Sequence, residues 1–149
     1  MSQRTAPNVD PALETRVRES FARQRIMSTI GARLTHIAPG ETDIELPFRA
    51  DLTQQDGFLH AGVIAAVADS ACGYAAYTLM SATAGVLSIE FKVNLLAPAI
   101  GSKVTARARV LRAGRTITVV RADVMAERDG TEKIVATMLG TMMAVEQRG

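Results

Sequence analysis

A long apolar segment at residues 61–80 limits what this chain can fold into. It consists mostly of small and aliphatic residues, and one carboxylate, Asp69, stands in the middle of it. A helix that is apolar on nearly all sides must be covered on more than one side. The segments that follow alternate apolar and polar residues and predict four strands, at 86–96, 103–112, 116–128 and 131–145. We therefore expect an α+β fold, in which an antiparallel sheet wraps around one long central helix and a partner subunit supplies further cover.

A membrane span is the alternative interpretation of this segment, because residues 61–84 approach the length that a helix needs to cross a bilayer. Asp69, several small residues and the lack of a cationic flank beside either end argue against it. The first twenty residues also lack the apolar core of a signal peptide. We therefore expect no membrane association.

The residues before the apolar helix predict another helix and a hairpin. Asp10 and Pro11 are typical of a helix start, and Gly31 can end the same helix. Alternation at 32–38 and 42–48, on either side of a Pro-Gly turn, predicts two paired strands.

The strand expected at 86–96 has the most regular alternation in the chain. Its pattern predicts an apolar face, whose members are Leu87, Ile89, Phe91, Val93 and Leu95. Ser88 and the polar residues that alternate with this set are expected on the opposite face.

Length and composition are those of one ordinary domain. The chain has 149 residues, enough to bury a core without staples, with 48% hydrophobic and 21% charged residues. Cys72 is the sole cysteine, which excludes an intrachain disulfide and fits a reducing compartment. We expect residues 1–149 to form a single cytoplasmic domain, with residues 1–9 disordered.

The start of the apolar helix and its carboxylate can both contribute to chemistry. His60, Ala61 and Gly62 open the helix, so free backbone N–H groups there could stabilise negative charge developing on a carbonyl oxygen. Asp69 could activate water as a general base or attack the carbonyl as a nucleophile. Nine positions separate His60 from Asp69, roughly opposite sides of a helix and about 13 Å along its axis. One reaction centre therefore needs Asp69 of one subunit to face His60 of another across a two-fold axis.

The sequence resembles the hotdog-fold acyl-CoA thioesterases, and specifically their PaaI-like branch. The resemblance covers nearly the whole chain and rests on the His60-Ala61-Gly62 triplet, on Asp69, and on Gln54, Gly57, Ser88, Pro98, Gly101, Gly114 and Arg115. It implies a hotdog fold and hydrolysis of an acyl-CoA thioester without a metal or other cofactor. It also implies active sites at the interface of a homodimer, which can assemble further into a dimer of dimers.

The resemblance also assigns roles to individual residues. The position of Gln54 carries an Asn or Gln that helps to orient water or the carbonyl, and Ser88 matches a hydroxyl that orients water. His60 shapes the oxyanion turn rather than transferring protons. Ala61 departs from the glycine that the family commonly has, so the acyl group is left open, from aryl-acetyl to medium chain.

A basic stretch suits the phosphates of coenzyme A. Between Phe91 and Ala122 there is no acidic residue, and the basic residues are Lys92, Lys103, Arg107, Arg109, Arg112, Arg115 and Arg121. Arg112 and Arg115 flank Gly114, a turn where the family often contacts the nucleotide end. By contrast, Arg107 and Arg109 are expected on a solvated strand face. The stretch has neither interleaved aromatic residues nor a nucleic-acid-binding motif, so we expect no nucleic-acid partner.

Other functions remain open from the sequence. Asp69 could be a structural carboxylate that caps or pairs at an interface, and His60 could simply bond nearby backbone. A hotdog dehydratase or hydratase would also pair a histidine with a helix carboxylate. A non-catalytic acyl-CoA-binding module is the third possibility, although such a regulator normally carries a DNA-binding segment.

Overall fold

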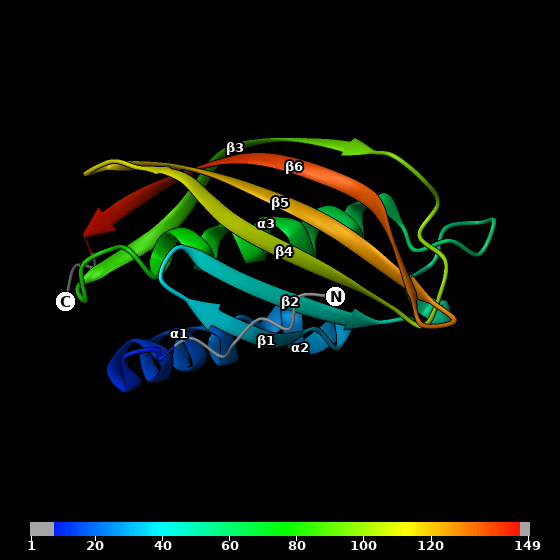
Figure 1. Ribbon diagram of the computed structural model, residues 1–149, viewed down its shortest axis with the longest axis horizontal. Coiled ribbons are helices and arrows are strands. Elements are labelled where there is room, and N and C mark those ends of the chain that lie inside the picture. The colour runs from blue at the N-terminus through cyan, green and yellow to red at the C-terminus, as the bar shows by residue number, and fades with distance from the viewer. Residues whose placement is uncertain (1–7, 147–149) are drawn as a thin grey trace.

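The computed structural model describes residues 8–146, which form one sheet around a central helix (Figure 1). The helices are α1 (Pro11–Arg23), α2 (Arg25–Ile30) and α3 (Ala61–Tyr77), with a short 3-10 turn at Ala50–Leu52. The strands are β1 (Arg33–Ala38), β2 (Glu41–Pro47), β3 (Ala84–Leu95), β4 (Lys103–Ala113), β5 (Ile117–Arg128) and β6 (Thr131–Glu146). Of the segment expected to be disordered, residues 1–7 lie outside the described part, and residues 8 and 9 precede α1 without regular structure.

The strands form an antiparallel sheet in the order β1-β2-β4-β5-β6-β3. The sheet curves over α3, which packs against every strand from β2 to β6 (Figure 1). The expected architecture, an antiparallel sheet wrapped around one long helix, is therefore confirmed. β1 and β3 are the first and last strands in this order, so β3 is one of the two edge strands of the sheet.

The core is built on the small side chains of α3. Val67, Ala68, Ala71, Ala75 and Ala76 have no exposed surface, and the aliphatic side chains of the strands pack directly onto them. Short side chains let the sheet approach the helix axis closely, which keeps the interior dense without a tryptophan. No helix within residues 8–146 combines the length and the apolar character needed to cross a bilayer.

The N-terminal helix is broken, which differs from the single helix expected up to Gly31. Gln24 adopts an extended backbone conformation between α1 and α2, and its side-chain amide donates to the Ser70 hydroxyl of α3 at 3.0 Å. An unbroken helix that buried Val17 would direct Ser28 inward about three turns later. The break changes the phase, so that Met27 in α2 is fully buried instead.

The C-terminus of α3 lies three residues earlier than expected, at Tyr77 rather than residue 80. Thr78 caps it with a hydrogen bond from its hydroxyl to the Ala75 carbonyl at 2.7 Å. The Arg16 guanidinium of α1 donates to three carbonyls here, those of Tyr77, Met80 and Ser81, at 3.0–3.3 Å. A cation that satisfies free carbonyls also complements the negative end of the helix dipole.

A β-bulge in β3 overturns the expected separation of its two faces. Ser88 pairs with Met142 and Glu90 with Thr141, so that Ile89 has no partner on β6. Phe91 then pairs with Gly140, where an added Cβ would lie 3.7 Å from Cys72 of α3. Directly paired residues share a face, so Ser88 and Phe91 both lie on the side of the helix, although strict alternation would oppose them.

Candidate active site

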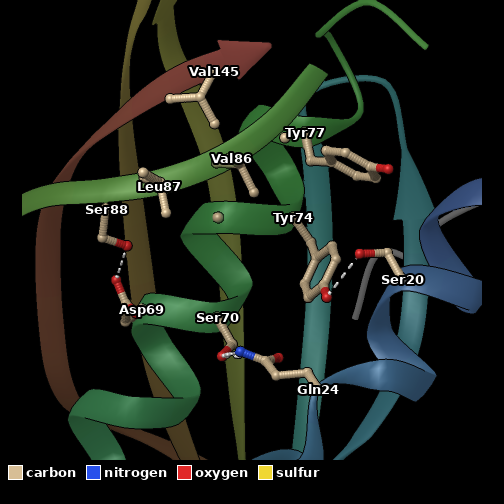
Figure 2. A pocket seen from close by; sticks show the side chains of 12 residues that line it. Ser20, Gln24, Asp69, Ser70, Tyr74, Tyr77, Val86, Leu87, Ser88 and Val145 are labelled. Carbon is tan, nitrogen blue, oxygen red and sulfur yellow. Dashed lines mark hydrogen bonds between the residues drawn. The ribbon is translucent and has the colours of Figure 1, made fainter. Parts of the chain in front are cut away.

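A hydrogen bond joins Asp69 of α3 to Ser88 of β3. The Ser88 hydroxyl donates to Asp69 Oδ1 at 2.7 Å and also lies 3.3 Å from the Met142 sulfur (Figure 2). Asp69 is half-buried at the side of α3 that faces the sheet edge. The carboxylate that looked isolated in the sequence thus has a partner 19 positions away, and its second oxygen is left for other contacts.

Asp69 and Ser88 line a pocket of about 370 Å³ between α1, α3 and β3 (Figure 2). Its apolar walls come from the start of β3 and the end of β6. The lining residues are Ser20, Gln24, Asp69, Ser70, Gly73, Tyr74, Tyr77, Gly85, Val86, Leu87, Ser88 and Val145. The pocket therefore places a carboxylate next to a space with an apolar wall and polar groups on α1.

His60 is the N-cap of α3. Its Nδ1 accepts a hydrogen bond from the Gly62 N–H at 2.8 Å. Nδ1 therefore carries no proton, and the Gly62 N–H is already occupied. The Val63 and Ile64 N–H groups bond to the His60 carbonyl. Within residues 8–146 the Ala61 N–H has no such partner, and of the two expected donors it is the one free for a ligand.

Gln54 lies in a tight loop before α3. Its side-chain Oε1 accepts from the Asp56 N–H at 2.6 Å and from the Phe58 N–H at 3.2 Å, and its N–H donates to the Phe58 carbonyl at 2.8 Å. These bonds fix the loop and leave the amide nitrogen of Gln54 as the group that can donate. Gln54 and Ala61 line a second pocket, about 370 Å³ in volume, with residues 95–99.

The two predicted halves of the site are separate within one chain. The pocket of Asp69 and Ser88 shares no lining residue with the pocket of Gln54 and Ala61. Asp69 lies nine positions after His60, which corresponds to about 13 Å along the helix axis. The fold therefore brings Asp69 to Ser88 and Gln54 to Ala61. Within one chain it keeps these two pairs apart.

Most of the basic stretch is occupied by ion pairs on the outer face of the sheet. The pairs are Lys103–Glu45 (2.9 Å), Arg107–Glu132 (2.7 Å), Arg109–Asp43 (3.1 Å) and Arg121–Asp123 (3.1 Å). Arg107 and Arg109 thus lie on a strand face as expected, but in partly buried ion pairs rather than freely solvated. Arg112 and Arg115 are exposed, and neither has a carboxylate partner in the part of the chain that the structure describes.

The turn between these two arginines requires glycine. A Cβ on Gly114 would lie 2.6 Å from the Ile117 carbonyl oxygen, closer than any side chain tolerates. Thr118, just after this turn, pairs with Met142, which pairs in turn with Ser88. Two strand spacings, about 10 Å, therefore separate the start of β5 from Ser88.

Cys72 lies in the same helix but cannot take part in the chemistry. Its side chain is fully buried, and burial, with a smaller contribution from the Asp69 charge, raises the pKa of its thiol from 9.0 to about 12. A thiol that stays protonated in a closed environment is a poor nucleophile. Across residues 8–146, no three His, Cys, Asp or Glu side chains are grouped so that they could hold a metal ion.

Several lining residues were missed by the sequence analysis. Gly73 and Tyr77 follow Asp69 at intervals of four, so the helical period places them on the same side of α3, and this signal was available. Ser20 comes from α1 and Gln24 from the break that follows it, and no local pattern indicates that this part of the chain lines the pocket. Their contacts, 3.2 Å to the Tyr74 hydroxyl and 3.0 Å to Ser70, depend on the tertiary fold.

Comparison with known proteins places this geometry in a family. The model of the thioesterase superfamily matches residues 56–133. The solved structure of a thioesterase family protein from Silicibacter pomeroyi is 50% identical, with 91% of this chain and 99% of that chain covered and a TM-score of 0.89. The 1,4-dihydroxy-2-naphthoyl-CoA hydrolase of Listeria monocytogenes is 25% identical, over 83% of this chain and 98% of that protein. The PaaI protein of E. coli, from the phenylacetic acid degradation operon, shares the fold at 16% identity, with 89% and 93% of the two chains covered and a TM-score of 0.81.

The family match spans more than half of the chain and includes Asp69 and Ser88. The Silicibacter pomeroyi protein is matched over almost its full length, and its architecture agrees with a sheet that wraps around one central helix. The chain therefore belongs to the thioesterase superfamily, as a hotdog-fold hydrolase of thioesters.

Proposed function

We propose that this chain is an acyl-CoA thioesterase for small to medium-length or aryl acyl groups. The observation that carries the proposal is the 2.7 Å hydrogen bond from Ser88 to Asp69 at the wall of an open pocket. A carboxylate with one oxygen fixed and the other available suits an attack on a thioester or the activation of water. The named activity of the Listeria monocytogenes relative, an acyl-CoA hydrolase, supports acyl-CoA as the substrate class.

The reaction can follow either of two routes from Asp69. As a general base, the carboxylate accepts a proton from water while the water oxygen bonds to the thioester carbon. As a nucleophile, it bonds to that carbon itself and forms an anhydride, which water then hydrolyses. In both routes the carbon–sulfur bond breaks, the coenzyme A sulfur takes up a proton, and a free acid is released.

The start of α3 supplies the groups that stabilise the oxyanion in this proposal. The Ala61 N–H is the donor, because the Gly62 N–H is held by His60 Nδ1. The positive end of the α3 dipole adds to this N–H, and Gln54 lines the same pocket. In this assignment His60 shapes the turn and carries no proton to or from the substrate.

The proposal places each active site between two subunits. In one chain the Asp69 pocket and the Ala61 pocket are separate, so an acyl carbonyl that needs both must lie between Asp69 of one subunit and Ala61 of another. The unpaired edge of β3 supports such an assembly, since Phe91 and Leu95 are 43% and 52% exposed there. We propose a homodimer formed at this edge, with a dimer of dimers as the larger assembly.

Arg112 and Arg115 are the proposed contacts for the coenzyme A phosphates. They are exposed beside Gly114 and have no carboxylate partner within residues 8–146, whereas most of their basic neighbours on the sheet are paired. Arginine's planar fork suits phosphate oxygens. We further place the protein in the cytoplasm, where acyl-CoA substrates are found.

A panel of acyl-CoA esters tests the proposed function. Thiol release, measured with a colorimetric thiol reagent, is expected for at least one acyl group in the range from acetyl to octanoyl and phenylacetyl. An Asp69→Asn variant is the matched control, because the amide keeps the shape of the carboxylate and removes its basicity. A panel without thiol release, on protein shown to be folded, would contradict the proposal.

The same panel separates the alternatives. A dehydratase or hydratase would change the absorbance of an enoyl-CoA or a 3-hydroxyacyl-CoA without releasing thiol. A binding module would bind acyl-CoA, detectable by calorimetry, and leave it intact.

A further inference from the structure

One face of α3 carries a gap between two side chains of the pocket. Asp69, Gly73 and Tyr77 follow one another at intervals of four and all line the same 370 Å³ pocket. A Cβ built on Gly73 would meet no atom within 4 Å, so the space above this residue is open. The helix therefore supplies a floor with the carboxylate at one end, a glycine in the middle and a tyrosine at the other end.

Tyr77 is a fixed wall rather than a mobile side chain. Its ring is 6% exposed, and the Arg16 guanidinium lies over it at 4.4 Å from the ring centroid. The same guanidinium is anchored by its hydrogen bonds to the carbonyls of residues 77, 80 and 81. The Tyr74 ring also packs edge-on against Tyr77, with 6.0 Å between the centroids. Contacts on both sides of the ring oppose its movement when a ligand enters.

The remaining walls near Gly73 favour an apolar occupant. Val86 and Leu87 of β3 and Val145 of β6 line the pocket across from the helix (Figure 2). Leu87 is 58% exposed in the single chain, which is a large apolar surface for a residue beside a carboxylate. An apolar group that enters over Gly73 would cover this surface.

We propose that Gly73 and Tyr77 set the length of the acyl group that the enzyme accepts. The inference rests on the proposed function, because the acyl group is taken to extend from a carbonyl beside Asp69 over Gly73 toward Tyr77. Tyr77 lies eight positions after Asp69, about 12 Å along the helix axis, and this length accommodates a phenylacetyl group or a chain of roughly six to eight carbons. Gly73 leaves the passage open, and Tyr77 closes it.

A larger residue at position 73 should shorten the preferred acyl chain, and a smaller residue at position 77 should lengthen it. Thiol release is measured on straight-chain acyl-CoA esters from acetyl to dodecanoyl, and kcat/KM is compared along the series. Gly73→Leu should lower the ratio of octanoyl to acetyl kcat/KM by about tenfold or more, as loss of pocket space for several methylenes predicts. Tyr77→Ala should raise the ratio of dodecanoyl to acetyl kcat/KM and shift the preferred chain length upward. Ala22→Leu, on the exposed face of α1 and outside the pocket, adds the same side chain as a control and should leave both ratios unchanged.

One further variant keeps the outcomes distinct. Gly73→Ala adds a single methyl group and favours the helix, so it should fold at least as stably as the parent protein and shorten the preferred chain slightly. Thiol release with a length profile that neither Gly73→Ala, Gly73→Leu nor Tyr77→Ala moves would reject this inference and leave the proposed function standing. Absence of thiol release from every ester with the parent protein would reject the proposed function and the inference together.

Discussion

The Ser88 hydroxyl donates a 2.7 Å hydrogen bond to the Asp69 carboxylate and thereby ties the edge strand β3 to the central helix α3. A hydrogen bond to a carboxylate oxygen is shorter and stronger than one between neutral groups, so this contact fixes the orientation of the carboxylate. Because both oxygens are bound to the same carbon, the hydrogen bond at Oδ1 also fixes the direction in which the second oxygen points. The pair explains how a carboxylate can stand in an apolar helix without being left unsatisfied.

Asp69→Asn is expected to fold normally and to lose about 10²–10⁴-fold in kcat, as removal of a general base or nucleophile predicts. The amide can still accept the Ser88 hydrogen bond, so the structural part of the contact survives. Circular dichroism and thermal unfolding establish the fold, and thiol release establishes the rate. Near-parental turnover in a folded Asp69→Asn protein would refute the mechanism.

Arg112→Ala combined with Arg115→Ala should raise KM for acyl-CoA and leave kcat nearly unchanged, because the two side chains are proposed to contact phosphates far from the reacting carbon. The matched substrate is an acyl-pantetheine thioester, which lacks the nucleotide and should be little affected. The parent enzyme should also lose affinity for acyl-CoA, but not for the pantetheine ester, as salt concentration rises. Equal losses on both substrates would mean that the arginines support the fold.

Mixing of two inactive variants should restore activity if each site is shared between subunits. One variant carries Asp69→Ala, and the other carries Ala61→Leu, which should block the oxyanion turn. Random pairing gives heterodimers with one doubly altered site and one intact site, so about a quarter of all sites should recover. Subunit exchange is confirmed by native mass spectrometry. A mixture that exchanges subunits but stays inactive would show that the sites are not shared.

Cys72 should be inert to thiol reagents in the folded protein, because it is fully buried and its pKa is raised to about 12. Labelling at pH 8, followed by mass spectrometry, should modify this residue only after denaturant is added. Rapid labelling of the native protein would contradict the burial of α3 under the sheet. The inertness also keeps the colorimetric assay free of background from the enzyme.

The raised pKa of Cys72 also predicts how alkaline pH changes the stability of the fold. The folded protein keeps a proton that the unfolded chain loses above its pKa of 9.0, so this contribution to stability is complete below pH 9 and is lost as pH rises toward 12. Urea unfolding at pH 8 and pH 10.5 should show a smaller loss of stability for Cys72→Ala than for the parent protein. An equal loss for both proteins would exclude the thiol as a source of alkaline sensitivity.

The periodic parts of the sequence predicted the fold well, and the irregular parts did not. Alternation of apolar residues gave the strands, and the apolar run gave α3, because burial on a sheet or around a helix imposes those periods directly. The break at Gln24 was missed because its cause is a side-chain contact with Ser70, far along the chain. The pairing of Asp69 with Ser88 was likewise not available from spacing, and only the family resemblance drew attention to both residues.

The face on which Ser88 lies was predicted wrongly for a specific reason. Nothing in the alternation at 86–96 marks the extra residue, since Ile89 is as apolar as Leu87 and Phe91 and continues their pattern. The bulge is fixed by the pairing of β3 with β6, which sequence periodicity cannot express.

The bulge also affects how relatives should be aligned with this chain. Ile89 is the residue without a partner, so its deletion would restore regular pairing and still keep Ser88 opposite Met142 and Phe91 opposite Gly140. Deletion of Glu90 instead would leave the same two pairs in place, whereas a deletion elsewhere in β3 would not remove the bulge. A homologue whose strand lacks the bulge should therefore have one residue instead of two between its equivalents of Ser88 and Phe91. A gap placed between these two positions keeps both of them in register in the alignment.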